Sequence, residues 1–303
     1  MKNHKSDFQA IAAKLVRRAC AFGIKKVDLG DADRCVIRSL GTARDYQACI
    51  ANFLNFRSDG NVPDDGPYLR IEMDDFLRLS ALTWRQKTMD QHRHALNKVF
   101  CVDLPRYLAE IPTNAAGKAY TEDEVTRIVP HQAPRNALGT ELLFSTGMRA
   151  FEPIRLCDAN VMEPSHERPW RDDLFVGLHD FVICQCPGKG GLCRSVAVPE
   201  RLYEELDRRR YDAPIEVRDR KIDYIAYFDV GSGQALSQSF GDASRVALGF
   251  SLGIHGLRHA YIQRRLAQLN SLGIPPRDAL EICSQEAGHF RAEITLHYTR
   301  PRH

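Results

Sequence analysis

The sequence predicts an α+β protein in two parts, an all-helical N-terminal part and a mainly helical second part that holds a small antiparallel sheet. Three observations support this prediction. Apolar residues recur at helical spacing through residues 1–106. Short β-rich runs flank a glycine-rich turn at residues 187–191, as in a β-hairpin. Helical patterns then return between residues 236 and 287.

Four helices are expected in the N-terminal part. In one of them the side chains of Tyr46, Ile50, Phe53 and Leu54 fall on a single apolar stripe. The last helix, residues 83–100, has a polar face rich in basic side chains. For a single helix such a face is more often simply solvated, but it can also bind a polyanion. The candidate anion-binding residues on this face are Arg85, Lys87, Arg93 and Lys98.

A linker is expected between the two parts. Residues 111–120 contain proline, asparagine and glycine, which favour an irregular segment. A helix begins after this segment, where Thr121 and Glu124 have the spacing of a capping box. The predicted domains are therefore residues 1–110 and 121–303.

The second part is expected to combine helices with one hairpin. A first helix ends at a tight glycine turn, and a second is expected to start near Arg149. The hairpin, residues 181–199, leads into a helix that Pro199 begins. Residues 211–235 are polar and irregular, and we assign no structure to them. Further helices are expected at about residues 236–248, 255–271 and 276–287, the last of them ended by Gly288.

The composition is that of a globular protein. The 303 residues are 44% hydrophobic and 27% charged, and the net charge of +3 does not by itself indicate a nucleic-acid partner. No apolar run approaches the roughly 20 residues needed to cross a bilayer, and the N-terminus lacks a signal-peptide pattern. We therefore expect a cytoplasmic protein.

The cysteines are expected to be reduced. There are nine of them, an odd number, scattered along the chain, which argues against a disulfide framework. Cys184, Cys186 and Cys193 form the only close group, and they lack the paired spacing of a zinc motif. We expect these three to be small core residues.

One face of the predicted helix at residues 255–271 is rich in cations and imidazoles. His255, Arg258 and His259 lie at positions i, i+3 and i+4, so they share this face. Because the opposite face is apolar and buried, the basic cluster suits a negatively charged guest. A zinc site formed by the two histidines is a weaker alternative, since the HExxH pattern is absent.

Four other residues of functional type lie at turns or follow them. Arg149 comes just after a glycine turn, and Lys189 lies at the tip of the hairpin. His289 follows a helix-ending glycine directly, and Tyr298 comes nine residues later. Each of these residues alone is more often structural, but their joint occurrence in this order is not expected by chance.

Together these segments resemble the catalytic domain of the tyrosine recombinases, the phage-integrase family. That family carries an arginine in a TG-x-R-x-x-E segment, a lysine on a hairpin turn, an H-x-x-R box, a G-H pair and a tyrosine about nine residues later. All six positions occur here in order, and Glu152 matches the acidic position. The resemblance covers residues 40–300 and includes the segment "TARDYQACIANFLNF". It implies a helical, SAM-like core-binding domain followed by the catalytic domain.

The resemblance implies an enzyme that cleaves and rejoins DNA strands through a 3′-phosphotyrosyl intermediate. Tyr298 would attack the phosphorus, with His255 as its base or orienter. Two arginines would hold the non-bridging oxygens, since guanidinium groups stay protonated and bind phosphate bidentately. Lys189 would protonate the departing 5′-oxygen. The implied catalytic set is Arg149, Lys189, His255, Arg258, His289 and Tyr298, with Glu152 in support. No cofactor is expected, because the sequence has neither a P-loop nor a cluster of acidic metal ligands.

The implied partner is double-stranded DNA with inverted half-sites, on which four protomers exchange strands through a Holliday junction. Accessory proteins and association with the nucleoid are further expectations, and a membrane partner is not. Arg194, after the hairpin, is a candidate contact to the DNA backbone. Only five residues follow Tyr298, so either another surface links the subunits, or the tyrosine is delivered differently, or the chain continues further.

Other functions remain open at this point. A type IB topoisomerase-like enzyme would use the same chemistry without pairing two DNA sites. A DNA-binding regulatory or accessory protein would keep the fold without turnover. A metal-dependent nuclease is the least supported. The sequence specifies neither the DNA site nor whether the task is integration, excision, resolution or inversion.

Overall fold

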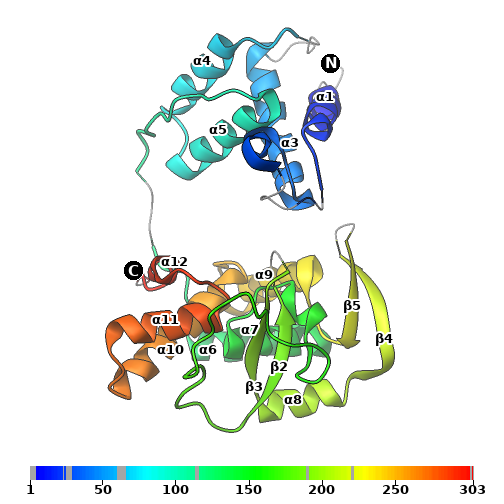
Figure 1. Ribbon diagram of the computed structural model, residues 1–303, viewed down its shortest axis with the longest axis vertical. Coiled ribbons are helices and arrows are strands. Elements are labelled where there is room, and N and C mark those ends of the chain that lie inside the picture. The colour runs from blue at the N-terminus through cyan, green and yellow to red at the C-terminus, as the bar shows by residue number, and fades with distance from the viewer. Residues whose placement is uncertain are drawn as a thin grey trace. The chain divides into compact units, whose positions relative to one another are not determined.

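A computed structural model describes residues 5–22, 24, 29–59, 66–112, 116–188, 191–219, 222–300 and 302. The chain divides into two compact units, residues 1–114 and 115–303, and each unit has its own hydrophobic core (Figure 1). The division falls inside the segment that was expected to be a linker. The predicted α+β class is confirmed, since helices predominate and the described strands form two small antiparallel sheets. No described helix is both long enough and apolar enough to cross a membrane.

The N-terminal unit is built from helices in its described part, joined by irregular segments. Its helices are α1 (Lys5–Arg18), the 3-10 helix η1 (Gly30–Cys35), α3 (Leu40–Arg57), α4 (Arg70–Ser80) and α5 (Gln86–Phe100). Helix α3 packs against α1, α4 and α5 and is the centre of the core. It begins at Ser39, whose Oγ accepts a hydrogen bond from the N–H of Thr42 at 3.1 Å. Contacts between aromatic rings join the helices. The ring centroid of Phe76 in α4 is 5.6 Å from that of Phe53 in α3 and 5.5 Å from that of Trp84.

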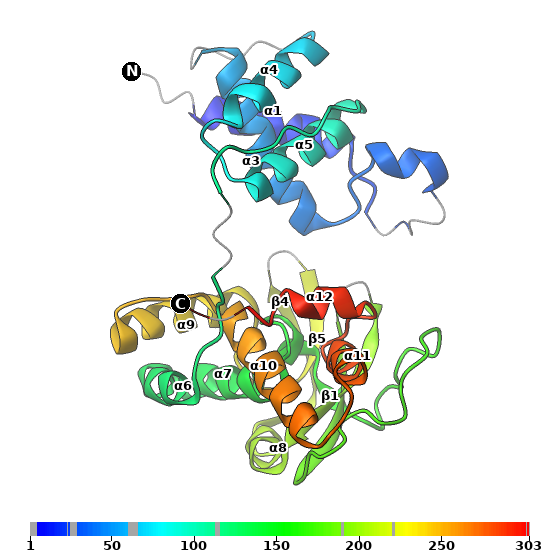
Figure 2. The ribbon, with the colours of Figure 1, turned by 90° about the vertical axis from the view of Figure 1, so that its left-hand side faces the viewer.

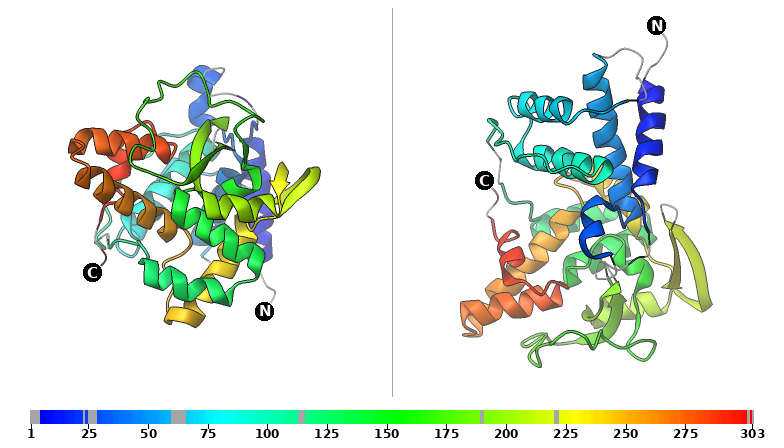
Figure 3. Two further views of the ribbon diagram at one scale, coloured as in Figure 1. Left: turned by 90° about the horizontal axis from the view of Figure 1, so that it is seen from below. Right: turned by 45° about the horizontal axis from the view of Figure 1, so that its top comes forward.

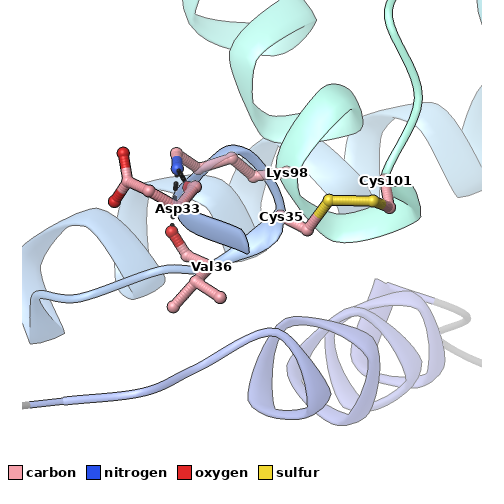
Figure 4. Close-up of a disulfide and its surroundings, with 5 residues drawn as sticks. All are labelled: Asp33, Cys35, Val36, Lys98 and Cys101. Atoms are coloured by element: carbon pink, nitrogen blue, oxygen red, sulfur yellow. Dashed lines mark hydrogen bonds between the residues drawn. A yellow bond between two sulfur atoms is a disulfide. The ribbon is translucent and has the colours of Figure 1, made fainter. Parts of the chain in front are cut away.

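A disulfide joins Cys35, at the end of η1, to Cys101, which follows α5 (Figure 4). The expectation of reduced thiols is therefore wrong for this pair, while the other seven cysteines are free. The two cysteines are 66 residues apart in sequence and meet only because η1 packs against α5. Lys98 of α5 reinforces this contact, since its ammonium group donates hydrogen bonds to the carbonyl groups of Asp33 and Val36.

Reduction of the Cys35–Cys101 disulfide is expected to destabilise the N-terminal unit. Loss of this cross-link frees the unfolded chain, which for a separation of this length costs about 4 kcal/mol in the chain-entropy description. Thermal unfolding of the full chain with and without reductant measures the effect, and the double variant Cys35→Ser/Cys101→Ser is the control. Reductant should lower the Tm of the wild type and leave that of the double variant unchanged. An unchanged wild-type Tm would contradict the expectation.

The second unit surrounds a three-stranded antiparallel sheet with helices. The sheet has the order β1 (Cys157–Asp158), β2 (Phe181–Pro187), β3 (Cys193–Pro199). Strands β2 and β3 form the predicted hairpin, in which Cys184 pairs with Val196. The helices are α6 (Glu122–Ile128), η2 (Val129–His131), α7 (Pro134–Thr146), η3 (Glu152–Arg155), α8 (Glu200–Asp207), α9 (Gly233–Leu248), α10 (His255–Ser271), α11 (Pro276–Glu286) and α12 (Ala292–Leu296). Helix α10 packs against both α7 and α11 (Figure 2).

A second hairpin occupies much of the segment that the sequence left unassigned. Strands β4 (Arg210–Asp219) and β5 (Ile222–Phe228) pair antiparallel and project from the body of the unit (Figures 1 and 3). Most residues of β4 are exposed, and its register shifts between Arg210 and Ile215. Tyr211, Ala213, Ile215 and Val217 do alternate with polar residues along β4, which is a strand signal, but Pro214 inside the run argues against an inner strand.

The glycine turn after α7 is followed by η3, not by the longer helix expected from Arg149. Pro153 lies in its first turn, and the chain leaves the helix at Leu156 to enter β1. Because of this short connection, the buried side chain of Glu152 contacts Arg149 and does not lie on the surface of a longer helix. The three clustered cysteines are core residues as expected, with Cys184 and Cys186 fully buried and Cys193 8% exposed.

Candidate active site

A tight turn after α7 begins the candidate site. Gly147 has φ +65°, and a Cβ at this position would lie 2.3 Å from Cδ1 of Tyr261. Only glycine fits this close approach and this left-handed conformation. The turn therefore brings Arg149 against α10, and the carbonyl of Gly147 accepts a hydrogen bond from Nη1 of Arg258.

Glu152 orients the Arg149 side chain from the buried side of the site. Its Oε1 accepts a hydrogen bond from Arg149 Nη1 at 2.7 Å, and its Oε2 accepts one from the Arg149 backbone N–H at 2.8 Å. The carboxylate is fully buried, whereas the Arg149 side chain is 22% exposed. Burial would raise the pKa of Glu152, but the charges of Arg194, Arg258 and Arg149 outweigh it and lower the pKa to about 2. Glu152 is thus a carboxylate at neutral pH, and it holds Arg149 at the surface of the site.

Arg258 of α10 is the central cation of the site. Its side chain is 1% exposed, and its guanidinium group donates hydrogen bonds to the carbonyl groups of Gly147 and Ala287. Burial and the neighbouring charge of Arg149 lower the pKa of Arg258 to about 10, so it remains charged at neutral pH. The residue therefore joins the turn after α7 to the turn after α11 and places a fixed positive charge between them.

His289 lies against this guanidinium group. Arg258 Nη2 is 3.1 Å from His289 Nε2, and because a guanidinium can only donate, Nε2 must accept. Burial and the charge of Arg258 lower the pKa of His289 to about 3. The imidazole is therefore neutral and carries its proton on Nδ1, which is buried and has no hydrogen-bond partner among the described residues. This N–H group is a donor available to a bound oxyanion.

The ring of Tyr298 lies among three imidazoles and this arginine. Its centroid is 4.6 Å from that of His259, 5.6 Å from that of His255 and 5.7 Å from that of His289. Arg258 Cζ is 5.8 Å from the same ring centroid. Tyr298 itself is 7% exposed and belongs to the apolar cluster between α10 and α11. A phenol, neutral imidazoles and fixed cations thus converge in one cluster.

His255 and His259 are also neutral at pH 7. Desolvation of the ring and the charge of Arg258 lower the pKa of His255 to about 4. Burial and the neighbouring His297 lower the pKa of His259 to about 4. A neutral imidazole keeps a free lone pair, so His255 can accept a proton from a nearby hydroxyl group.

The lowered pKa of the buried His259 predicts a loss of stability in mild acid. Between the ordinary pKa of 6.5 and the folded pKa of about 4, the unfolded chain binds a proton at His259 and the folded chain does not. Stability is therefore greatest above pH 6.5 and falls as the pH decreases toward 4, by about 3 kcal/mol from His259 alone. The free energy of unfolding, measured with denaturant at several pH values across this range, should fall by this amount.

Substitution separates the contribution of His259 from that of the other titrating groups. We expect His259→Gln to weaken the dependence of the unfolding free energy on pH. The control substitution His179→Gln, at an exposed position, should leave that dependence unchanged. Equal slopes in all three proteins would contradict the assignment.

The residues after Tyr298 contact the same unit. Gln263 Nε2 of α10 donates hydrogen bonds to the carbonyl groups of Tyr298, at 2.8 Å, and of Arg300, at 3.1 Å. Arg302 forms an ion pair with Glu124 of α6 at 2.7 Å. These contacts fasten the tyrosine-bearing segment to α10 and α6.

The structure brings Arg149, His255, Arg258, His289 and Tyr298 together. Lys189 lies outside the described residues, although Gly188 before it and Arg194 of β3 after it both lie beside Glu152. His259 and Gln263, which contact Tyr298, were not assigned a role from the sequence. Their i, i+4 spacing on the face that carries His255 is a signal that would have found them.

Two of the expected DNA contacts are corrected by the structure. Arg194 is 1% exposed, and its guanidinium group bonds to Glu152 and to the carbonyl of Glu286, so it has no surface to offer a DNA backbone. Lys98 binds backbone carbonyl groups of η1 instead of facing outward. Arg93 is half-buried beside the carbonyl of Leu104, whereas Arg85 and Lys87 are exposed.

Comparison of the sequence and the fold with those of known proteins indicates the class of protein to which this site is similar. No family model matches the chain. A curated integrase/recombinase from Escherichia coli is 29% identical over 187 residues, which are 57% of this chain and 50% of the relative. The chain thus spans about half the length of that relative.

Solved structures match over nearly the whole chain. The XerH site-specific recombinase in a post-cleavage complex with palindromic difH substrate has a TM-score of 0.56 at 15% identity, covering 99% of this chain and 94% of that one. A lambda integrase tetramer bound to a Holliday junction has a TM-score of 0.54 at 14% identity, covering 98% and 78%. The chain therefore has the fold of the site-specific recombinases. Within that class, the XerH and lambda integrase structures both resemble this chain along both of its units.

Proposed function

We propose that this chain is a site-specific DNA recombinase that cleaves and rejoins strands through a tyrosine–3′-phosphate intermediate. The observation that carries the proposal is the position of the Tyr298 ring among neutral imidazoles and beside the buried guanidinium of Arg258. The fold of the site-specific recombinases, with recombinase relatives in curated proteins, supports it.

The cations of the site would stabilise the charge that develops on the phosphate. Arg149, held by Glu152 and partly exposed, would bind one non-bridging oxygen. Arg258 is 1% exposed, but its Nε has no hydrogen-bond partner among the described residues, so it would stabilise the other oxygen by its charge and by this donor. The Nδ1–H of His289 would add a third hydrogen bond. Donors fixed in advance of the reaction are worth far more in a water-poor site than in solution, because they need no reorganisation.

Tyr298 would supply the nucleophile. Its phenol oxygen attacks the phosphorus and gives up its proton, for which His255 is the acceptor, and the bond from phosphorus to the 5′-oxygen breaks. Lys189 would give a proton to the departing 5′-oxygen. The reverse attack by a 5′-hydroxyl group of a second strand rejoins the DNA and releases the tyrosine. We propose that neither a metal ion nor ATP is needed, since the phosphotyrosyl bond conserves the energy of the broken one.

The DNA partner would be a duplex with inverted half-sites bound by four protomers. In this proposal residues 1–110 form the core-binding domain, residues 111–120 the linker and residues 121–303 the catalytic domain. Arg85 and Lys87, which are exposed, are the candidate phosphate contacts of the first domain. Accessory proteins would set the direction of exchange, and the protein would act on the nucleoid in the cytoplasm.

A nicked suicide substrate tests the proposal. Duplexes taken from DNA that flanks the gene are incubated with the full chain in the presence of EDTA and separated on a denaturing gel. The expected result is a covalent protein–DNA band, which a regulatory protein of the same fold would not give. Relaxation of DNA without products that join two sites would instead favour a topoisomerase-like enzyme. Specific binding without any covalent band would contradict the proposal.

A further inference from the structure

Arg194 of β3 is a fully buried arginine beside the candidate site. It is 1% exposed, and it lies on the strand that follows the hairpin turn. Nη2 donates to Oε2 of Glu152 at 2.9 Å, and Nε donates to the carbonyl of Glu286 at 3.0 Å. A guanidinium group leaves water only when its charge and N–H groups are compensated, so these partners account for its position.

Arg194 and Arg149 share one carboxylate. Oε2 of Glu152 accepts from both Arg194 Nη2 and the Arg149 backbone N–H, while Oε1 accepts from Arg149 Nη1. The bond to Arg194 therefore fixes the rotation of the carboxylate that presents Oε1 to Arg149. Without Arg194, Oε2 would keep one donor, and the plane of the carboxylate would be less constrained.

The charges of the cluster give Arg194 a second role. A carboxylate paired with Arg149 alone would cancel much of the charge that a phosphate requires. With Arg194 present, three guanidinium groups surround one carboxylate, and two positive charges remain for the phosphate oxygens. Removal of Arg194 would leave one. Glu152 can therefore orient Arg149 by hydrogen bonds without neutralising the site.

The surrounding backbone closes tightly on this pair. A Cβ at Gly188 would lie 3.1 Å from Glu152 Oε1, and a Cβ at Gly288 would lie 3.1 Å from Arg194 Cδ. Gly188 follows β2 and is the last described residue before Lys189, and Gly288 precedes His289. The Arg194–Glu152 pair thus lies between the hairpin, the Arg149 turn and the His289 turn.

We propose that Arg194 is a positioning residue that balances the charge of Glu152, so that Glu152 holds Arg149 in place while two positive charges remain for the scissile phosphate. This inference rests on the proposed function. It does not place Arg194 in contact with DNA, and it replaces the backbone contact that the sequence had suggested.

Three variants test the proposal by single-turnover formation of the covalent adduct at saturating protein. Arg194→Met removes the balancing charge, and Arg194→Met/Glu152→Gln restores the net charge of two while keeping a side-chain acceptor for Arg149. Arg265→Met is the matched control, because it breaks another buried pair in the same unit, with Glu286, in which the side chains are 2% and 0% exposed. Gel shifts measure DNA binding, and thermal unfolding gives the folded fraction of each protein.

Arg194→Met is expected to slow adduct formation by about tenfold or more per folded, DNA-bound molecule, with little change in DNA affinity. The double variant should recover most of this rate, whereas Arg265→Met should lose stability with a much smaller change in rate. A wild-type rate in Arg194→Met, or a double variant no faster than the single one, would overturn the proposal. A rate loss no larger than that of Arg265→Met would also reduce Arg194 to a packing role.

A second measurement separates this inference from the proposed function. Inorganic phosphate, compared with chloride at equal ionic strength, is expected to raise the Tm of the wild type and of the double variant more than that of Arg194→Met. If wild type forms no adduct on any DNA but this phosphate effect depends on Arg194, the proposed function fails and the charge balance stands. If phosphate stabilises Arg194→Met as much as wild type, the charge balance fails even when the adduct forms.

Discussion

Tyr298→Phe is expected to abolish the covalent protein–DNA product and leave DNA binding intact. The substitution removes one oxygen atom from a ring that is 7% exposed and packed among the rings of His255, His259 and His289. The ring contacts persist in phenylalanine, so the fold of the site should be retained. The loss is expected to be complete, because phenylalanine has no hydroxyl group with which to attack the phosphorus.

A second buried tyrosine provides the matched control for this experiment. Tyr261 lies on α10 in the same apolar cluster, and its hydroxyl group donates a hydrogen bond to Glu286 at 2.9 Å. Tyr261→Phe should cost stability, because that carboxylate loses a donor, but it should still give the covalent band. A band that persists in Tyr298→Phe would show that another residue attacks the phosphorus.

Arg258→Lys is expected to slow strand cleavage by about 10²- to 10³-fold, the usual cost of removing a fixed donor from a site of developing negative charge. Arg258 reaches three acceptors on two turns, the carbonyl groups of Gly147 and Ala287 and Nε2 of His289. A lysine keeps the charge but presents one nitrogen, so it cannot join both turns and also face a phosphate. The rate should fall far more than the affinity for DNA.

Arg264→Lys is the control for this substitution. Arg264 is on the same helix, but it contacts the carbonyl and the ring of Phe144 and lies outside the Tyr298 cluster. Single-turnover cleavage of both variants on the nicked duplex should separate the two roles, with Arg264→Lys close to wild type. Equal rates in Arg258→Lys and wild type would remove Arg258 from the proposed chemistry.

The helices of the second unit were the most predictable part of the fold. Helix α10 covers the predicted residues, and α11 ends one residue before the predicted end. A helix is specified by apolar spacing within one segment, so its pattern is legible without knowledge of what it packs against. Hairpin β4–β5 could also have been predicted, since Tyr211, Ala213, Ile215 and Val217 alternate with polar residues along β4, although Pro214 inside the run argues against an inner strand.

The roles of individual polar residues were less predictable. Arg194 looked like a surface cation and is buried, because its partners Glu152 and Glu286 come from segments 42 and 92 residues away. Lys98 and the Cys35–Cys101 pair were misassigned because their contacts with η1 join residues 62 to 66 positions apart. No local pattern records a contact across such a separation.

The sequence by itself determined which chemical groups this protein carries and on which elements: a tyrosine after a G-H turn, an H-x-x-R helix face and an arginine after a glycine turn. These are properties of short segments, set by turn residues and helical spacing. Only the tertiary structure decided which of those groups meet and in what state. Packing of α7, α10 and α11 buries Arg258, keeps the imidazoles uncharged and assigns one carboxylate to two arginines. Burial and neighbouring charge set protonation and hydrogen bonding, and both depend on residues that are distant in sequence.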